Sequence, residues 1–450
     1  MFTWYRELCN HERKTFWACF AGWAVDAMDA QLFSFSLPVL MAVWRFSTVE
    51  AGYLATATLL SAAIGGWACG YLADRFGRVR IMQATICWFC LFTFIAGLTQ
   101  DYYQLLAARV LQGLGFGGEW AAGAVLMGEI IRPAYRGKAV GCVQSGFGIG
   151  WSVAALLAAV VLDDLPPEYG WRALFVLGAL PGLLVLYLRR EIAEPDVYKK
   201  TQALLNKAGD RPGLMAIFQP GTVSITVLSS LLAFGVIGVG GAITNWLPTF
   251  MKTFRHLSPS SAGYYVISVT GGSFFGFVVS AYLSDAIGRR RSFLLFLVCS
   301  WFVTIAYLFL PLSGWALIFM GAPFGFFTLG TYAVLGPFFT ELFPTAIRAN
   351  GQSFAYNFGK ATGAVAVSCI GVLAQWMTLA GAIGLIALAG YSISIVAILL
   401  LPETKGINLM PGFEEAKPYS LQESSQVRAA ESLVHGTAKP YASNEAPSRT

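Results

Sequence analysis

The stretch GYLADRFGRVR, from Gly70 to Arg80, recurs as AYLSDAIGRRR from Ala281 to Arg291, at an offset of 211 residues. A second stretch, EIIRPAYRG from Glu129 to Gly137, recurs as ELFPTAIRANG from Glu341 to Gly351, at an offset of 212 from glutamate to glutamate. Two motifs that recur at nearly the same offset indicate an internal repeat. The sequence therefore predicts two structurally equivalent halves.

The composition places both halves in a membrane. Of the 450 residues, 56% are hydrophobic and 12% are charged, and the mean hydropathy is +0.62, whereas soluble domains carry about 25% charged residues. The N-terminal stretch lacks the short apolar segment and cleavage site of a removable signal peptide, so the first apolar run is expected to be a true span. The net charge of +6 comes from basic loops between apolar runs, which indicates membrane orientation rather than nucleic-acid binding.

Apolar runs of about 20 residues, the length that crosses a bilayer, recur along the chain. Each span must be a helix, because lipid offers no hydrogen-bond partner to the backbone. We therefore expect an all-α membrane protein with twelve transmembrane helices in two pseudo-symmetric six-helix bundles. The predicted spans are residues 16–40, 51–73, 81–99, 103–130, 139–162, 171–189, 221–250, 261–284, 292–311, 314–340, 351–376 and 380–401.

One long polar break divides these helices six and six. The last stretch of the chain is rich in Ser, Ala, Glu and Lys without apolar periodicity, which is typical of a disordered segment. The expected division is a bundle at 1–190, an inter-bundle loop at 191–220, a second bundle at 221–402 and a disordered tail at 403–450.

Lysine and arginine are distributed unequally between the two sides of the predicted bundle. Twenty of them lie on the side of the termini and the long loop, and four lie opposite, at Arg45, Arg172, Lys252 and Arg255. Cytoplasmic loops carry the excess of basic residues. We therefore expect both termini, the loop and the tail to lie in the cytoplasm.

Two aspartates interrupt the first apolar run, in GWAVDAMDAQLFSF from Gly22 to Phe35. Asp26 and Asp29 are three residues apart and share one face of a helix. A carboxylate inside a membrane is costly and marks a functional candidate. No histidine lies in the predicted spans, so at least one aspartate is a candidate proton carrier. The alternative is a structural ion pair or a polar lining without a cycle of its own.

A polar stripe runs along the fourth predicted span, with Arg109, Gln112 and Glu119 at helical spacing. By depth, Glu119 is level with Asp26, and Arg109 is nearer to Asp29. We expect an Asp29–Arg109 pair, with Asp26 or Glu119 as the group that switches protonation. Arg109 would accept a substrate carboxylate when Asp29 is protonated. The alternative is a permanent salt bridge between the two helices.

A second stripe lies in the eleventh predicted span and includes Tyr356, Asn357 and Lys360. Lys360 is near mid-depth, and a lone cation facing the interface of the halves suits an anionic substrate. The alternative is a lysine that neutralises an acidic group across the interface. Further candidates for the lining of the site are Gln144, Asn245, Trp246, Tyr332 and Trp120.

The repeated motifs resemble those of the major facilitator superfamily, and the resemblance covers the chain up to Gly406. The specific signature is the loop with Gly70, Asp74, Gly77 and Arg80, together with the Arg109-to-Gly117 stretch. PETKG (Pro402–Gly406) resembles the sugar porters. GGEW, WRALFVLGALPGLL and YNFGK are more similar to bacterial proton symporters of carboxylates, such as sialate and aromatic-acid carriers.

The resemblance implies a conformational latch at the cytoplasmic edge, made of charges that recur in both halves and do not touch substrate. Charge networks that form only when one side is closed bias a two-state equilibrium. The expected latch residues are Asp74, Arg75, Arg78, Glu129, Arg136, Asp285, Arg289, Glu341 and Arg348.

The function expected from these features is import of a small organic anion with protons, through alternating access, in a bacterial inner membrane. No enzyme activity, cofactor, nucleotide or metal is implied; the eight cysteines are expected to be free thiols, and the protein a monomer. The alternatives are a proton-coupled sugar or polyol porter, a drug efflux antiporter, an intramembrane enzyme that holds magnesium on DAMD, and a sensor. The stretch from Gly141 to Ala155 lacks the Gly-Pro pair of the superfamily's antiporters, which disfavours efflux.

Overall fold

The computed structural model describes residues 3–189, 192–208, 211–253, 259–311 and 314–409. Within these residues all regular structure is helical and no strand occurs. The N-terminal half begins with a short helix, α1 (Thr3–Glu7). Its spans are α2 (Asn10–Trp44), α3 (Thr48–Phe76), α4 (Arg78–Leu98), α5 (Tyr102–Ile130), the pair α6 (Arg136–Val143) and α7 (Gly146–Asp164), and α8 (Pro167–Arg189), with a 3-10 turn η1 (Pro133–Tyr135) before α6.

The C-terminal half repeats this plan after a helical linker. The linker contains α9 (Asp196–Ala208) and η2 (Leu214–Phe218). The spans of the second half are α10 (Val223–Ala233), continued by the π-helix η3 (Phe234–Val239) and α11 (Gly240–Thr253), then α12 (Pro259–Ile287), α13 (Arg289–Phe309), α14 (Gly314–Gly330) with α15 (Tyr332–Leu342), η4 (Thr345–Ile347), α16 (Arg348–Leu373) and α17 (Leu379–Leu400).

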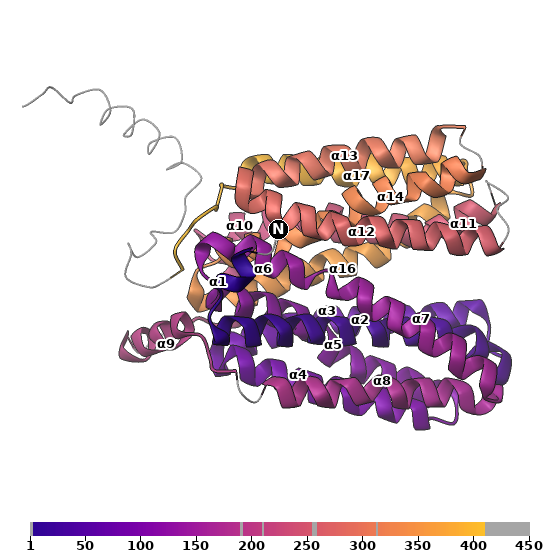
Figure 1. Cartoon of the computed structure of the whole chain (residues 1–450), viewed down its shortest axis with the longest axis horizontal. Helices are drawn as coiled ribbons and strands as arrows, with labels where there is room; N and C mark the ends of the chain where they lie inside the picture. Colours follow the sequence, from indigo (N-terminus) through magenta and orange to yellow (C-terminus); the bar gives the residue numbers. More distant parts are fainter. Residues whose placement is uncertain (1–2, 190–191, 209–210, 254–258, 312–313, 410–450) are drawn as a thin grey trace, which may run out of the picture.

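The predicted fold of twelve spans in two bundles is confirmed when each interrupted helix is counted as one span. Nine helical segments of the described chain are long and apolar enough to cross a membrane. The other three, α5, α8 and α16, have 29, 23 and 26 residues. Figure 1 shows the N-terminal half, in indigo to magenta, beside the C-terminal half, in orange to yellow, with most helices along the long axis.

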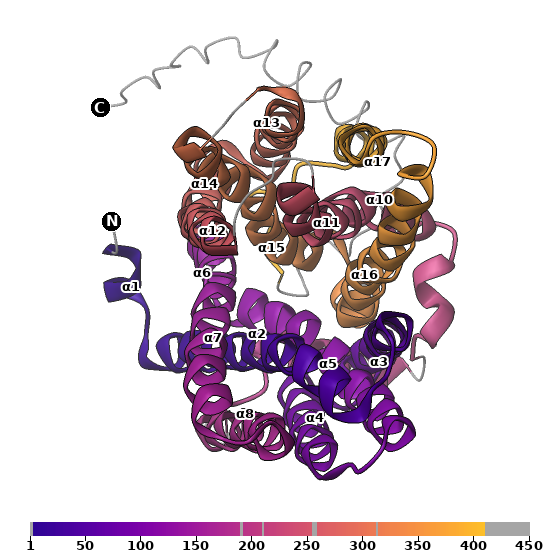
Figure 2. The same cartoon turned by 90° about the vertical axis from the view of Figure 1, so that its right-hand side faces the viewer.

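The two halves meet along a defined set of helices, which Figure 2 shows end-on. From the N-terminal half, α3, α5, α6 and α7 face the partner bundle, and from the C-terminal half α12, α15 and α16 do so. The contacts pair α3 with α16, α5 and α6 with α15, and α6 with α12. A substrate that passes between the halves must therefore pass these helices.

The repeated motif folds into the same turn in each half. Gly77 between α3 and α4 has φ +117°, and Gly288 between α12 and α13 has φ +102°. Side chains rarely adopt such angles. A Cβ at Gly77 would also lie 2.4 Å from Glu194, and a Cβ at Gly288 would lie 2.5 Å from Glu403. Glycine is thus required twice, at equivalent positions.

Two predicted spans are broken near the middle, and a third is locally widened. Gln144 and Ser145 separate α6 from α7, and Thr331 separates α14 from α15. The first span of the C-terminal half contains the π-helix η3, which adds a residue to the turn and often marks a functional position. All three irregularities are packed inside protein, where their backbone groups find partners other than lipid.

Two predictions about the polar segments are corrected. The segment predicted as a loop at 191–220 contains α9 and η2, and Val197 and Tyr198 of α9 are buried. The segment predicted to be disordered begins with an ordered stretch, because Thr404 is 1% exposed. Residues 410–450 of that predicted tail lie outside the described residues.

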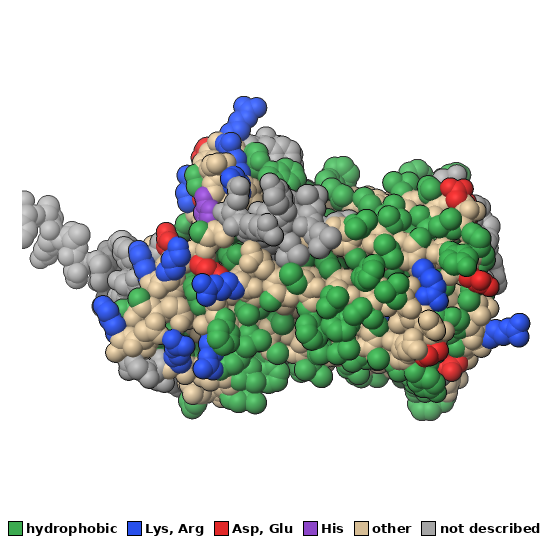
Figure 3. Space-filling view, turned by 90° about the horizontal axis from the view of Figure 1, so that it is seen from below, with side chains coloured by type: hydrophobic (Ala, Val, Ile, Leu, Met, Phe, Trp, Pro, Cys, Tyr) green, Lys and Arg blue, Asp and Glu red, His purple; other side chains and the backbone are tan. Residues whose placement is uncertain are grey.

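Charge and hydrophobicity are separated along the molecule. Figure 3 shows hydrophobic side chains along its length and most Lys and Arg side chains gathered at one end. We call this the basic end; it carries α1, α9 and the N-termini of α4, α6, α13 and α16. Hydrophobic side chains on the outside of the bundles, such as Leu156 at 69% exposed, suit contact with lipid.

Candidate functional site

Asp29 is held inside the N-terminal half by side chains from two neighbouring helices. It is 3% exposed. The hydroxyl of Thr93 on α4 donates to Asp29 Oδ1 at 3.0 Å, and Gln112 Nε2 on α5 donates to Asp29 Oδ2 at 2.7 Å. Burial of a charge is tolerated where hydrogen bonds and a counter-charge replace water.

The counter-charge of Asp29 is Arg109, as the depth of the two residues predicted. Arg109 Nη1 lies 3.9 Å from Asp29 Oδ2 and donates to Gln112 Oε1 at 2.5 Å. Its guanidinium carbon also lies 3.9 Å from the ring centroid of Phe33. Gln112 therefore bridges the arginine and the aspartate, and the Nε of Arg109 remains buried without a hydrogen-bond partner.

Asp26 and Glu119 are buried in the same half, at 1% and 4% exposed. Together with Asp29, they place three acidic groups from α2 and α5 near the buried thiol of Cys90 on α4. Cys90 was not among the residues that the sequence singled out, because a single cysteine in an apolar run has no distinctive pattern.

Lys360 reaches across the interface between the halves. It is half-buried on α16, and its Nζ lies 5.3 Å from the ring centroid of Phe116 on α5 and 5.0 Å from that of Tyr356. The carboxylate of Asp26 acts electrostatically on it. The predicted placement of this cation at the interface of the halves is thus the placement that the structure shows.

Other predicted lining residues join the halves around Lys360. Tyr356 is buried, with its ring 5.9 Å from that of Trp120 on α5. Asn357 Nδ2 donates to the carbonyl of Ser353 at 2.9 Å and lies 3.5 Å from the carbonyl of Gly117 on α5. The polar stripe of α16 therefore faces the N-terminal half.

Gln144 and Tyr332 lie where two of the helices are interrupted. Gln144 Nε2 lies 3.5 Å from the carbonyl of Tyr332, across the interface of the halves. The hydroxyl of Tyr332 donates to the carbonyl of Ile237 in η3 at 3.3 Å. These two residues therefore connect the break in the fifth span, the break in the tenth span and the π-helix.

Asn245 and Trp246 make separate contacts within the C-terminal half. Asn245 is exposed, and its amide donates to the carbonyl of Gly241 on its own helix at 3.2 Å. The indole of Trp246 donates to the carbonyl of Val367 on α16 at 2.9 Å. The described bond of Asn245 thus lies within α11, whereas that of Trp246 joins α11 to α16.

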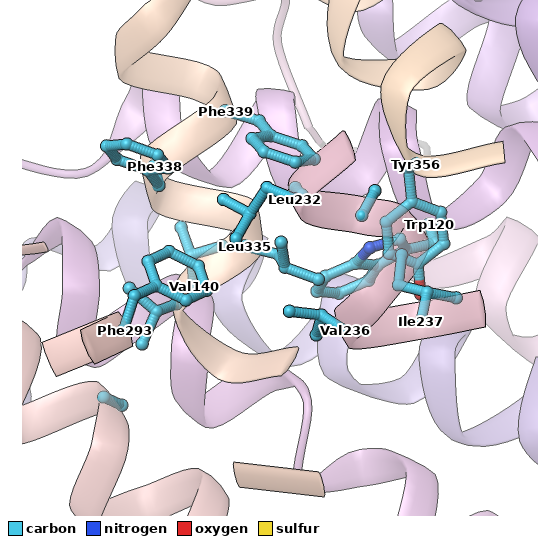
Figure 4. Packing of buried hydrophobic residues seen from close by; sticks show 14 of the residues in the cluster. Trp120, Val140, Leu232, Val236, Ile237, Phe293, Leu335, Phe338, Phe339 and Tyr356 are labelled. Carbon is cyan, nitrogen blue, oxygen red and sulfur yellow. The ribbon is translucent and has the colours of Figure 1, made fainter. Parts of the chain in front are cut away.

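A hydrophobic layer lies between these polar residues and the basic end. Figure 4 shows Trp120 and Tyr356 beside Val236 and Ile237, with Leu335, Val140 and Phe339 continuing the cluster. Gly336 lets α15 approach α6, because a Cβ there would lie 2.7 Å from Val140. The layer contains residues from both halves.

At the basic end, a chain of charges begins in the N-terminal half and ends in the other half. Asp74 and Arg78 lie 2.6 Å apart, and Arg78 and Glu129 lie 3.3 Å apart. Glu129 then accepts from Arg348 of the C-terminal half at 2.6 Å. These side chains are buried, so their bonds are shielded from water.

The C-terminal half contains the equivalent chain. Asp285 and Arg289 lie 2.5 Å apart, and Arg289 and Glu341 lie 2.9 Å apart. Glu341 also accepts from Arg136 of the N-terminal half at 3.1 Å. Each glutamate therefore binds an arginine of its own half and one of the other half.

The aspartates of the two motifs also cap helices across the interface. Asp74 accepts from the backbone amides of 349–350 at 3.1 and 2.8 Å, at the start of α16. Asp285 accepts from the amides of 137–138 at 3.0 and 2.8 Å, at the start of α6. Negative charge is favourable at a helix N-terminus. The basic end is closed by these bonds.

This arrangement of two equivalent bundles agrees with comparison to known proteins. A family profile described as Major Facilitator Superfamily matches residues 19–320, more than half of the chain. The chain belongs to this superfamily. The predicted resemblance is confirmed, and the protein is a membrane transporter of the superfamily and not an enzyme.

Relatives within the superfamily share most of the length of the chain. A protein of Cupriavidus pinatubonensis named "Probable 4-methylmuconolactone transporter" is 44% identical over 90% of this chain and 94% of its own length. The cis,cis-muconate transport protein of Acinetobacter baylyi is 32% identical over 80% of this chain and 86% of its own. The sialic acid transporter NanX of Escherichia coli is 28% identical over 88% and 95%.

Solved structures of the superfamily share the fold. The proton:xylose symporter XylE, bound to 6-bromo-6-deoxy-D-glucose, has a TM-score of 0.74 and 19% identity, covering 89% of this chain and 98% of its own. The E. coli fucose:proton symporter FucP has a TM-score of 0.68 and 13% identity, covering 85% and 97%. The likeness to both is one of architecture.

Two further carboxylates of the transporter cap helices at its basic end. They were not predicted from the sequence. Glu194 accepts from the amides of 78–80 at 2.8 to 3.2 Å, at the start of α4. Glu403 accepts from the amides of 289–290 at 2.8 and 3.1 Å, at the start of α13. Each follows the last span of its half, so the repeat itself was the signal that could have found them.

Arg75 does not join the ion pairs for which it was predicted. It is exposed, and its Nη1 donates to the hydroxyl of Tyr71 at 3.3 Å. The other eight predicted latch residues all take part in the two chains of charge. Arg75 points away from the ion pairs because neighbouring residues of an α-helix lie about 100° apart around its axis.

The first and the last described segments of the transporter each contact the opposite half. The indole of Trp4, 4% exposed, donates to the hydroxyl of Tyr282 on α12 at 2.5 Å. Arg136 donates to the carbonyl of Ile407, beyond the last span, at 2.9 Å. Among the described residues, no three His, Cys, Asp or Glu side chains are placed to hold a metal ion.

Proposed function

We propose that the protein imports a small carboxylate metabolite together with protons, by alternating access between its two bundles. The observation that carries this proposal is Lys360, a cation of one half whose ammonium lies against Phe116 of the other half. A carboxylate bound there would gain a charge-assisted hydrogen bond and contact both halves. A neutral sugar would gain nothing from a fixed cation.

Proton coupling follows from the charges inside the bundle. Among the described residues of the membrane interior, three carboxylates, Asp26, Asp29 and Glu119, stand against two cations, Arg109 and Lys360. A substrate carboxylate adds another negative charge to a site with little water. Binding a proton on one of the acids offsets that charge, because nearby like charges favour the protonated form.

The two cations have different roles in this proposal. Lys360 is the first group to meet the substrate, with Tyr356, Asn357, Gln144 and Tyr332 around it. Arg109 is held by Asp29 at rest. Protonation of Asp29 removes the counter-charge of Arg109 and makes its guanidinium available to a carboxylate. Asp26 and Glu119 are the further candidates for the proton site.

The orientation proposed for the transporter places the basic end in the cytoplasm, with both chain ends, in a bacterial inner membrane. Residues 1–190 and 221–402 would move as two bodies joined by the linker at 191–220. Because ion pairs join the halves at the basic end, we infer that a state held together there loads substrate from the outside. One chain contains both halves of the site, so we propose that the monomer transports.

The substrate class rests on the relatives together with Lys360. Their names mention muconate, a methylmuconolactone and sialic acid. We therefore expect a small organic acid, with unsaturated carboxylates as the first compounds to test.

Uptake by proteoliposomes tests the proposal. Radiolabelled cis,cis-muconate should accumulate faster when the outside is acidic, and a protonophore should prevent accumulation. Matched liposomes without protein give the background. Uptake that is unaffected by collapse of the proton gradient would reject symport. Accumulation of xylose, with no accumulation of an organic acid, would favour the sugar porter. Export driven by the proton gradient would favour the antiporter.

A further inference from the structure

A cavity of about 180 Å³ lies at the basic end, away from Lys360 and the intramembrane acids. Three parts of the chain form its walls. The end of α3 contributes Tyr71 and Arg75, the linker contributes Gln202 and Arg211, and the segment that starts α16 contributes Ile347. The N-terminal half, the linker and the C-terminal half therefore each supply one wall.

Two guanidinium groups in this cavity have only neutral hydrogen-bond partners. Arg75 Nη1 donates to the Tyr71 hydroxyl at 3.3 Å, and Arg211 Nη2 donates to the side-chain oxygen of Asn206 at 2.6 Å. Neither forms an ion pair with a carboxylate of the described chain. Arg78 and Arg348, by contrast, are bound to acids at the same end of the molecule.

The acid that lines the cavity does not neutralise these two arginines. Asp74 is bound to Arg78 at 2.6 Å, and both of its oxygens accept from the backbone amides of 349–350. On the same linker Lys199 is paired with Asp196 at 3.5 Å, and the exposed Lys200 adds a positive charge. The cavity is therefore a positively charged recess with two guanidinium groups available on its walls.

The internal repeat shows that Arg75 is not needed for the ion pairs beside it. At the offset of 211 that relates Asp74 to Asp285, the residue equivalent to Arg75 is Ala286. The C-terminal half nevertheless forms its own aspartate–arginine pair at 2.5 Å. A positive charge at the position of Arg75 is thus present only in the N-terminal half, whose wall faces the linker.

We propose that this cavity binds a phosphate group, carried by a lipid headgroup or by a free phosphate ester, between Arg75 and Arg211. The planar fork of arginine matches the oxygens of phosphate and can bind two of them at once. Because the walls come from both halves, a bound phosphate stabilises the state in which the basic end is closed. The site regulates transport and does not depend on the identity of the transported substrate.

Variants of the full chain test this site with glycerol 3-phosphate as the soluble probe and phosphatidic acid in nanodiscs as the lipid probe. Arg75→Ala copies the residue that the chain already has at position 286, so the turn tolerates it. Arg211→Ala removes the second cation. The matched control is Lys207→Ala, which removes an exposed charge from the same linker but not from the cavity wall.

The melting temperature of the purified protein is recorded against each probe. We expect a saturable rise for the unmodified protein and for Lys207→Ala, with half-saturation shifted at least about tenfold in Arg75→Ala and Arg211→Ala, as the loss of a charged hydrogen bond requires. A response to the soluble ester alone identifies a free metabolite, and a response to the lipid alone identifies a headgroup. Equal responses of Arg75→Ala and Lys207→Ala, or no response to either probe, would overturn the proposal.

Discussion

The charged residues of the internal repeat are conserved between the halves at the basic end but differ between them in the membrane interior. At the basic end each half has the same aspartate–arginine pair, at 2.6 and 2.5 Å, and the same glutamate that binds one arginine from each half. In the interior the charges are not repeated. At the offset of 212 that joins Glu129 to Glu341, Arg109 corresponds to Gly321, Glu119 to Thr331 and Lys360 to Gly148.

This difference separates two tasks of the transporter. Closing and opening one end of two equivalent bundles is a symmetric problem, and equal bonds in both halves solve it. Recognising one anion and a proton is not symmetric, because acids and cations must face each other across the interface. The acids lie in α2 and α5 of one half and Lys360 lies in α16 of the other.

The largest effect on transport is expected from a change at Asp29, in the asymmetric interior. Asp29→Asn keeps the shape of the side chain but leaves Arg109 buried with only neutral acceptors, and losing one partner of a buried pair costs about 3–5 kcal/mol. We expect concentrative uptake of muconate by proteoliposomes to disappear. Asp29→Glu keeps the charge and should retain measurable uptake, and thermal melting of both variants separates transport from folding. Full uptake by Asp29→Asn would remove this aspartate from the cycle.

The symmetry of the basic end is tested by Glu129→Gln and Glu341→Gln. Each change weakens bonds to two arginines, and hydrogen bonds to charged groups contribute about 1.5–3 kcal/mol each. We expect hydrogen exchange at the starts of α6 and α16 to quicken by at least roughly tenfold in both variants. If only one variant responds, the two chains of charge are not equivalent.

Lys360→Met tests the asymmetry of the interior, because it removes the cation that the C-terminal half supplies. The loss of one charge-assisted contact should raise the KM for an acid roughly tenfold, with a smaller change in kcat. The methyl ester of the same acid should be affected less, because it carries less charge. Lys360→Arg is the control that keeps the cation. An equal loss for the acid and its ester would assign Lys360 to packing.

The smallest effect is expected at the crossing of the chain end. Trp4→Phe keeps the ring and removes the N–H that donates to Tyr282 of the other half, a bond contributing about 1 kcal/mol. Hydrogen exchange in α1 should quicken about fivefold. Trp17→Phe is the matched control, because its indole donates to Tyr5 within the same half. Equal changes in both variants would show that the Trp4–Tyr282 bond between the halves protects α1 no more than the Trp17–Tyr5 bond within one half.

Much of the fold was predictable, because hydrophobic length and the position of charge are local properties. The repeated motifs predicted the two halves, and the depth of Asp29 and Arg109 along their helices predicted their pair. The arginines that bind Glu129 and Glu341 were harder to predict from the sequence. The sequence places Arg136 near Glu129, yet in the structure Arg136 binds Glu341 of the other half, because the two bundles face each other there.

The sequence by itself determined the twelve spans, the internal repeat, and the acids and cations inside the membrane. These features follow from the cost of exposing backbone and charge to lipid, which acts on each helix separately. Only the tertiary structure decided that Lys360 faces α5 and that Glu194 and Glu403 cap helices. It also decided that Arg75 lines a cavity with Arg211 rather than joining the ion pairs. Such placements depend on how the two halves meet, and the distance between residues far apart in the chain is set by packing alone.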